Sequence, residues 1–527
     1  MNSSFRSNEI WQVWNRVHNS VPEAQEQQRK DEEELQKPAL PPPPPPPPPH
    51  FNKYVNTFIG TGGQGHTYPG ATVPFGMVQL SPDNGNEGWA YSSGYHYNAS
   101  TIIGFSHTHL SGTGIGDLLD ISVQPTLSPI NSTSLKEFWD LDLRQSFNHS
   151  NEVAEPGYYS VFMDHGLQKN PFAPIDSAAF EPQSSASSSE YLPGIVLNLC
   201  FALNTDALEA SLIELTSISS SDDLINGTWT TSITGYRKST GWAENHHVYF
   251  AMEFSVPLSA VTLIQGAEVE TVVADNHGMM KGVAEGEYTI AYFTFDNLKN
   301  SINSDNNITT DPNNTGDSAD ENEEEPLLVL LKIGISSVSV EGAKDNLRLE
   351  NPNWDFDSVR QAAAAAWESE LRKIVVQGGT EEAKSVFYTS LYHTKLAPTI
   401  LSDKSGAYRG PDSQIHRVLS GSNIRSGNLV TSASESENDN SYDANTSFSP
   451  DYYSTFSIWD TFRAAHPLLT ILNPDRVKDM MRTFLAHADH QGGLLPFLAI
   501  SWSRNKNNAG LSCGGDAHRS GKEKSIK

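Results

Sequence analysis

Three side chains in the stretch Tyr453–Arg463 have the chemistry to grip a sugar. Trp459, Asp460 and Arg463 place a flat apolar ring, a carboxylate and a guanidinium within five residues. An indole covers the C–H face of a sugar ring, while the charged groups bond its hydroxyls. The same residues also have a purely structural interpretation, in which a buried Asp460–Arg463 pair stabilises the start of a helix. The motif taken alone leaves both interpretations open.

A second group of aromatic, hydroxyl and imidazole side chains lies in Gly-rich segments nearer the N-terminus. Trp89 begins one segment, and His107 and His109 lie in the next, Gly104–Gly114. These side chains suit contact with a sugar or with another domain, or structural hydrogen bonding. A metal site is the third possibility, because His-x-His on a strand puts both rings on one face. His66 or Asp117 would then supply a third ligand.

Composition excludes several other classes of function. The chain has 527 residues and a formal net charge of -28, which argues against nucleic acid and anionic membranes as partners. No run of apolar residues is long enough to predict a transmembrane helix. Gly60–Gly65 matches G-x-G-x-x-G, but Pro69 and Pro74 forbid the helix that a dinucleotide site needs.

Two features of the sequence make conflicting predictions about the cellular compartment of the protein. The N-terminal residues lack the apolar segment of a signal peptide, which predicts a cytoplasmic protein. A secreted protein is the alternative, because the chain carries Asn-x-Ser/Thr glycosylation sequons at Asn2, Asn98, Asn131, Asn148, Asn226, Asn307, Asn313 and Asn445.

The secondary structure that the sequence predicts changes along the chain. Residues 1–50 are polar and end in prolines, which predicts a disordered arm with a polyproline spacer. Short runs rich in Val, Ile, Tyr and Thr then recur about every ten residues from Tyr54–Ile59 onward, as in a β-sandwich. Residues 166–192 and 298–325 are expected to be solvent-facing loops.

Helical periodicity follows the predicted β-sandwich. Asp357 is the expected N-cap of the first helix, and Glu381–Leu396 forms the next. Two later helices are predicted over Thr455–Ile471 and Pro474–His487, with Phe456, Phe462 and Leu469 on one apolar face of the former. The sequence thus predicts a multidomain protein with β structure first and α structure second.

Ordered motifs across much of the chain resemble glycoside hydrolase family 92, the calcium-dependent exo-acting α-mannosidases. The N-terminal matches are Val55–Gly63, His66–Asp83, Ser93–His96 and Gly104–Gly112, and the later matches are Leu391–Thr394, Tyr408–Gly410, Trp459–Arg463 and Gly492–Pro496. The resemblance implies an N-terminal β-sandwich joined to an (α/α)6 barrel. It divides the chain into the arm 1–50, a sandwich 51–345, a linker helix region 346–378, the start of the barrel catalytic domain 379–500, and a non-homologous polar tail 501–527.

The same resemblance implies the site and its ligands. Asp460 is expected to bond the terminal mannose hydroxyls, with Trp459 and Arg463 as its support and Trp89 on the sandwich wall of the pocket. His66, His107 and His109 are possible pocket or interdomain residues. Calcium is the implied cofactor, without identifiable ligands here, and the implied partners are mannose-containing glycans in an unspecified oligomeric state.

The chain departs from the family pattern after Pro496. Inverting glycosidases use an acid and a base, and in the family the acid lies in a Gly-x-Glu-Thr stretch soon after the matching Leu-Pro. Here the next glutamate is Glu523, in a Lys-rich polar segment. We therefore expect a C-terminally truncated chain with an incomplete barrel, which is inactive or a mannose-binding fragment.

Overall fold

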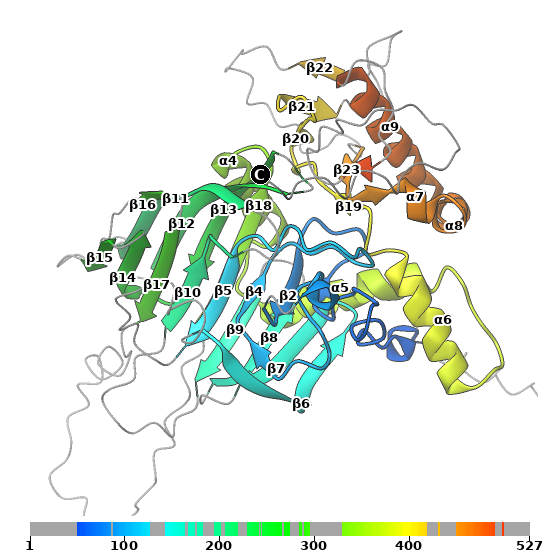
Figure 1. Ribbon diagram of the computed structural model, residues 1–527, viewed down its shortest axis with the longest axis horizontal. Coiled ribbons are helices and arrows are strands. Elements are labelled where there is room, and N and C mark those ends of the chain that lie inside the picture. The colour runs from blue at the N-terminus through cyan, green and yellow to red at the C-terminus, as the bar shows by residue number, and fades with distance from the viewer. Residues whose placement is uncertain are drawn as a thin grey trace, which may run out of the picture. The chain divides into compact units, whose positions relative to one another are not determined.

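Antiparallel strands build the N-terminal part of the chain into two large sheets (Figure 1). The computed structural model describes residues 50–85, 88–126, 143–163, 167–173, 177–182, 194–201, 206–219, 229–241, 243, 245–265, 268–273, 284–286, 289–295, 329–418, 430–432, 450–490 and 498–499. The expected arm 1–49, the loop 298–325 and the tail 501–527 lie outside these residues.

One sheet has eight described strands, and the other has ten. The eight-stranded sheet has the order β1 (Ala71–Thr72), β2 (Gln79–Asp83), β4 (Gly104–Ser106), β5 (Ser122–Thr126), β10 (Gly194–Asn198), β17 (Thr289–Phe295), β14 (Leu258–Gln265) and β15 (Glu268–Val273). The ten-stranded sheet has the order β16 (Ala284–Gly286), β11 (Asp206–Ser219), β12 (Trp229–Thr240), β13 (His246–Phe254), β18 (Val329–Ser336), β9 (Ser177–Pro182), β8 (Leu167–Ala173), β7 (Tyr158–Met163), β6 (Gln145–Glu155) and β3 (Thr101–Ile102).

Side chains from both sheets share one core. In β13, Val248, Phe250, Met252 and Phe254 join this core at every second position, the period of a strand that faces the core with one side. Phe254 packs on Phe293 of the other sheet, with ring centroids 5.4 Å apart. Each such fully buried side chain contributes about 1.5–3 kcal/mol, so the shared core holds the two sheets together as a sandwich.

Helices α4 (Val340–Glu350) and α5 (Phe356–Leu371) follow the last strand. The Ser339 and Asp355 side chains cap them by accepting from backbone N–H groups. Trp367 of α5 is fully buried and donates its indole N–H to the Thr72 carbonyl of β1 at 2.6 Å. The first helices after the sheets are therefore anchored to the sandwich.

The remaining helices and small strands form a separate group of elements along the chain. They are α6 (Glu381–His393), β19 (Thr399–Ile400), β20 (Ala407–Arg409), β21 (Ile415–Val418), β22 (Val430–Ser432), β23 (Tyr453–Ser454), β24 (Phe456–Ser457), α7 (Ile458–Thr461), α8 (Ala465–Leu472), α9 (Pro474–His490) and β25 (Leu498–Ala499). Phe75 from the β1–β2 loop is buried in their core against Tyr453, Phe456, Leu469 and Met480. A ring from the N-terminal segment thus completes the helical core.

Several sequence predictions differ from the structure. Tyr54–Ile59 is no strand, because it continues a 3-10 turn, η1 (Asn52–Tyr54), and packs on α6. The predicted helix Thr455–Ile471 is divided into α7 and α8, and Phe462 is half exposed instead of facing the core. The N-cap of α5 is Asp355, and not Asp357 as the sequence predicted.

The predicted loop 166–192 contains two strands. β8 pairs with β7, and β9 pairs with β18, so this segment continues the ten-stranded sheet. Only the β9–β18 pair joins residues that are distant in sequence, and this pairing overrides the weak strand propensity of a Pro- and Ser-rich segment. The (α/α)6 barrel itself stays a prediction.

Candidate functional site

Trp89 and His66 meet beside Ser92 in the loops at one edge of the sandwich. The two rings are in edge contact with centroids 4.2 Å apart, and the Ser92 hydroxyl lies 2.8 Å from His66 Nδ1. Burial lowers the pKa of His66, helped by nearby His96, so the imidazole is neutral at physiological pH. Its Nε2 atom is buried and has no hydrogen-bond partner within the part of the chain that the structure describes.

The Trp89 indole is exposed and yet held in place. It belongs to the turn η2 (Trp89–Tyr91), is 56% exposed, and donates its N–H to the Gly114 carbonyl. A side chain at Gly114 would collide with the indole, because an added Cβ would lie 2.6 Å from a ring carbon. A large apolar ring fixed against backbone but open to solvent is suited to stacking on a ligand.

His107 and His109 are placed differently from His66. Both are buried inside the sandwich, where His107 Nδ1 lies 2.6 Å from the Ile121 carbonyl. His109 uses both nitrogens, at 2.7 Å from the Gln79 carbonyl and 3.1 Å from Asp83. Burial lowers the pKa of His107 to about 4. The geometry favours structural hydrogen bonding, among the alternatives that the sequence left open.

Asp117 does not complete a metal site with these histidines. Its two carboxylate oxygens accept the backbone N–H groups of Leu118 and Ala243 at 2.8 and 3.1 Å. No sequence pattern marked its neighbour Asp120, whose buried carboxylate pairs with Arg237 at 2.6 Å and His246 at 2.7 Å. Although burial acts to raise it, interactions with His246 and Arg237 hold the pKa of Asp120 well below its usual range. This network joins the loops to β12 and β13.

The Trp459–Asp460–Arg463 motif lies at the surface. Trp459 is 63% exposed, and Asp460 and Arg463 are exposed as well. Asp460 accepts a hydrogen bond from the Ser457 hydroxyl that precedes α7, and no ion pair joins it to Arg463 among the described residues. The buried Asp–Arg pair is therefore excluded, and three groups able to contact a ligand remain available.

A cavity of about 850 Å³ lies elsewhere, between α4, α5 and the first residues of the helical part. Its charged side chains already have partners. Asp403 accepts from Ser336 and Asn346, and Glu370 pairs with Lys395 at 2.9 Å. None of the sequence-predicted site residues lines this cavity, and it presents no exposed aromatic ring to a sugar.

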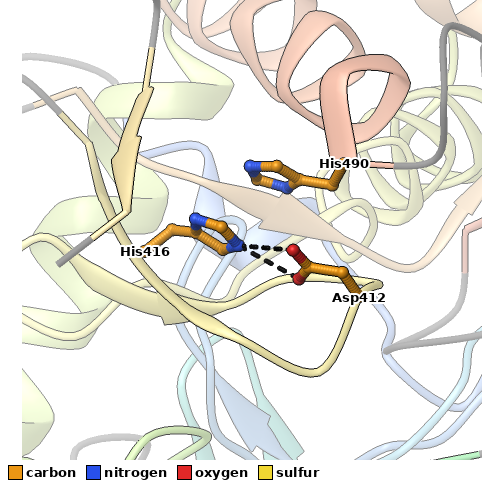
Figure 2. Close-up of side chains that lie close together, drawn as sticks. All are labelled: Asp412, His416 and His490. Carbon is orange, nitrogen blue, oxygen red and sulfur yellow. Dashed lines mark hydrogen bonds and ion pairs between the residues drawn. The ribbon is translucent and has the colours of Figure 1, made fainter. Parts of the chain in front are cut away.

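One cluster that sequence reasoning missed has the composition of a metal site. Figure 2 shows Asp412 and His416, at the two ends of a turn entering β21, with His490 at the end of α9 above them. Their potential ligand atoms all lie within 4.8 Å of one another, and the described residues contain no other such group of three. The Asp-x-x-x-His spacing was the available signal, but His490 is distant in sequence.

This cluster does not fit the calcium that the family resemblance implies. Calcium takes six to eight oxygen ligands, whereas two of these three groups are imidazoles. No step involving calcium can be derived from the described residues. They also include no helix long and apolar enough to cross a membrane.

A β-sandwich followed by helices, with exposed indoles beside polar groups, is an arrangement suited to carbohydrate binding. Comparison with known families makes this specific: residues 54–305 match the glycosyl hydrolase family 92 N-terminal domain, and residues 342–517 match the family 92 catalytic domain. The chain belongs to glycosyl hydrolase family 92.

Solved structures and a curated protein agree with this family. A family GH92 α-mannosidase from Bacteroides thetaiotaomicron is 29% identical, with a TM-score of 0.64 over 86% of this chain and 52% of that one. A second structure, with the same identity and TM-score, contains mannoimidazole and covers 86% of this chain and 50% of that one. An uncharacterized secreted glycosidase from Arthroderma benhamiae is 25% identical over 66% of this chain and 41% of its own length. The chain thus spans about half the length of the solved structures.

Proposed function

We propose that this protein recognises terminal α-mannose of N-glycans and glycoproteins through Trp89, Trp459, Asp460 and Arg463. Family membership and the α-mannosidase and mannoimidazole-bound relatives support the substrate class. The observation that carries the binding site is the fixed yet exposed Trp89 indole. Because it is already held by Gly114 and His66, stacking on a sugar requires little loss of side-chain freedom.

Hydrolysis in the complete family architecture would be inverting. That chemistry needs an acid at the leaving oxygen and a base that activates water, about 6.5–9.5 Å apart. Asp460 would bond sugar hydroxyls and leave both of these roles to other carboxylates. The stretch after Ala499, including Glu523, lies outside the described residues. We propose that the 527-residue chain binds terminal mannose but does not cleave the mannosidic bond.

The secreted alternative suits this function better than a cytoplasmic location. The curated relative is described as secreted, and the sequons of this chain would be glycosylated only along the secretory route. Glycoprotein substrates are also found along that route.

Calorimetry with methyl α-mannoside tests the binding site. Trp89→Ala should weaken binding about 10-fold, since aromatic stacking contributes about 0.5–1.5 kcal/mol beyond the area it covers. Asp460→Asn should weaken it similarly by removing a charged acceptor. Methyl α-glucoside, which differs in one hydroxyl orientation, should bind more weakly than the mannoside.

Trp354→Ala is the matched control, because Trp354 is also an exposed indole, 37% exposed and stacked under Lys332. It should leave mannoside affinity unchanged. Equal losses in the Trp89 and Trp354 variants, or unchanged binding in both Trp89→Ala and Asp460→Asn, would contradict the assignment.

A further inference from the structure

The two rings of the Asp412–His416–His490 cluster differ in how firmly they are held. His416 Nε2 lies 3.0 and 3.1 Å from the two oxygens of Asp412, which fixes its ring (Figure 2). His490 lies parallel to it, with ring centroids 3.7 Å apart and an angle of 14° between the planes. The carboxylate thus orients one imidazole, and the second is placed only by stacking.

The ring nitrogens of the cluster are unusually short of partners. Both nitrogens of His490 and Nδ1 of His416 are buried and lack hydrogen bonds within the described ranges. Leaving a buried polar atom unpaired costs about 1–3 kcal/mol. The unpaired nitrogens of His490, beside the Asp412 carboxylate and the His416 Nε2 atom that faces it, indicate a ligand that accepts nitrogen lone pairs.

We propose that Asp412, His416 and His490 bind a single divalent transition-metal ion of the zinc type. Two imidazoles and one carboxylate are a donor set that suits zinc, and three protein ligands leave a fourth position open for water. This inference is independent of mannose binding, because none of the three residues belongs to the proposed sugar site.

Metal binding requires one ring to turn. Imidazole lone pairs lie in the ring plane, so two parallel stacked rings cannot both point at one ion. His490 is the ring that turns, because its nitrogens have no hydrogen bonds to break and it is the last residue of α9. His416 keeps its place beside Asp412, and metal binding therefore breaks the stack.

Aromatic side chains surround the cluster and shield it. Tyr408 lies 5.7 Å from the His416 ring and stacks on Tyr452 at 3.7 Å. At Gly410 an added Cβ would lie 2.6 Å from Asp412 Oδ1 and 2.9 Å from His416 Nε2. The apolar walls lower the local dielectric, which strengthens metal–ligand attraction.

Titration of the EDTA-stripped 527-residue chain with zinc chloride, followed by calorimetry and thermal melting, tests the site. Zinc should bind and raise the melting temperature, and calcium chloride at the same concentration should not. His490→Ala should remove one equivalent of zinc or weaken it about 100-fold. Cobalt bound in place of zinc should give visible absorption, and this absorption should be absent in His490→Ala. The absorption spectrum reports the metal site independently of protein stability.

His149→Ala is the matched control, because His149 also pairs with one carboxylate, at 2.7 Å from Glu152, without a second imidazole as a third ligand. It should retain full zinc stoichiometry. Gly410→Ala removes no ligand yet should weaken zinc by filling the space beside Asp412 and His416. Unchanged zinc binding in His490→Ala, or equal stabilisation by calcium and zinc, would overturn the proposal.

Discussion

Asp403 shows how burial sets the behaviour of a single residue. Its carboxyl is nearly inaccessible and is surrounded by Ser336, Asn346 and the backbone of α4. Burial raises the pKa of Asp403 to about 6, because the two hydrogen bonds only partly replace the water that a carboxylate loses. The folded protein therefore holds a proton here that the unfolded chain releases at lower pH.

Asp403 should consequently make stability depend on pH. Because its pKa is raised on folding, its contribution is complete below the unfolded value near 4 and is lost as the pH rises through about 6. The shift corresponds to about 3 kcal/mol of unfolding free energy between these limits. Denaturant unfolding at several pH values would measure it.

Asp403→Asn is the comparison variant, since the amide mimics the protonated acid. It should be more stable than the parent at pH 8 and no more stable at pH 4. Glu370, whose pKa is lowered to about 2, acts in the opposite direction at lower pH and is present in both proteins. Parallel pH profiles for parent and variant would show that Asp403 is ionised throughout.

At the scale of elements, helix α5 packs closely on the turn between β6 and β7 of the sandwich. Gly157, in the β6–β7 turn, lies against Ala363 of α5, where an added Cβ would be 2.8 Å from the Ala363 Cβ. The turn also needs a positive φ of 84° at this glycine. Both requirements are met only by glycine.

Gly157→Ala should destabilise the protein by about 1–3 kcal/mol more than Gly378→Ala, because crowding against α5 is added to the backbone strain. Gly378 has a similar φ of 80° but nothing within 4 Å of an added Cβ, so it reports strain alone. Thermal melting of both variants gives the difference.

A second change isolates the contact. Adding Ala363→Gly to Gly157→Ala should recover part of the stability lost to steric crowding. The comparison must allow for the lower helix propensity of glycine at position 363. No recovery relative to the two single variants would mean that α5 does not press on this turn.

Element order was more predictable than element boundaries. β structure followed by helices agrees with the comparisons, and Glu381 correctly begins α6, because the Thr380 side chain caps it. Strands β8 and β9 were missed because their Pro- and Ser-rich segment has weak strand propensity, and β9 pairs with β18, which is distant in sequence. Exposure of Asp460 and the approach of His490 to His416 depend on tertiary packing, which local spacing does not encode.

At the scale of the whole molecule, the chain has no glutamate where the family pattern places the general acid, since none occurs between Pro496 and Glu523. General acid assistance is typically worth about 10²–10⁴-fold, and losing acid and base together removes nearly all activity. The 527-residue chain is therefore expected to release no mannose from an activated aryl α-mannoside, with or without added calcium. A colorimetric assay against a boiled control measures this.

The leaving group of that substrate needs little protonation, so the assay tests chiefly the base. Turnover well above the boiled control, and dependent on calcium, would contradict the expectation and place the missing groups within this chain. Inactivity combined with intact mannoside binding would match the proposed role.

The contacts of Phe51, Asn52 and Asn56 also determine when this segment can fold during synthesis of the chain. Glu368 accepts the backbone N–H groups of Phe51 and Asn52 at 2.8 and 3.2 Å, and Thr389 accepts that of Asn56 at 2.9 Å. These partners are 316 to 333 residues later in the chain. At about 5–20 residues per second on the ribosome, the early segment waits tens of seconds for them. Its apolar side chains stay available to chaperones during that interval, and residues 51–56 cannot make their final contacts before α6 emerges.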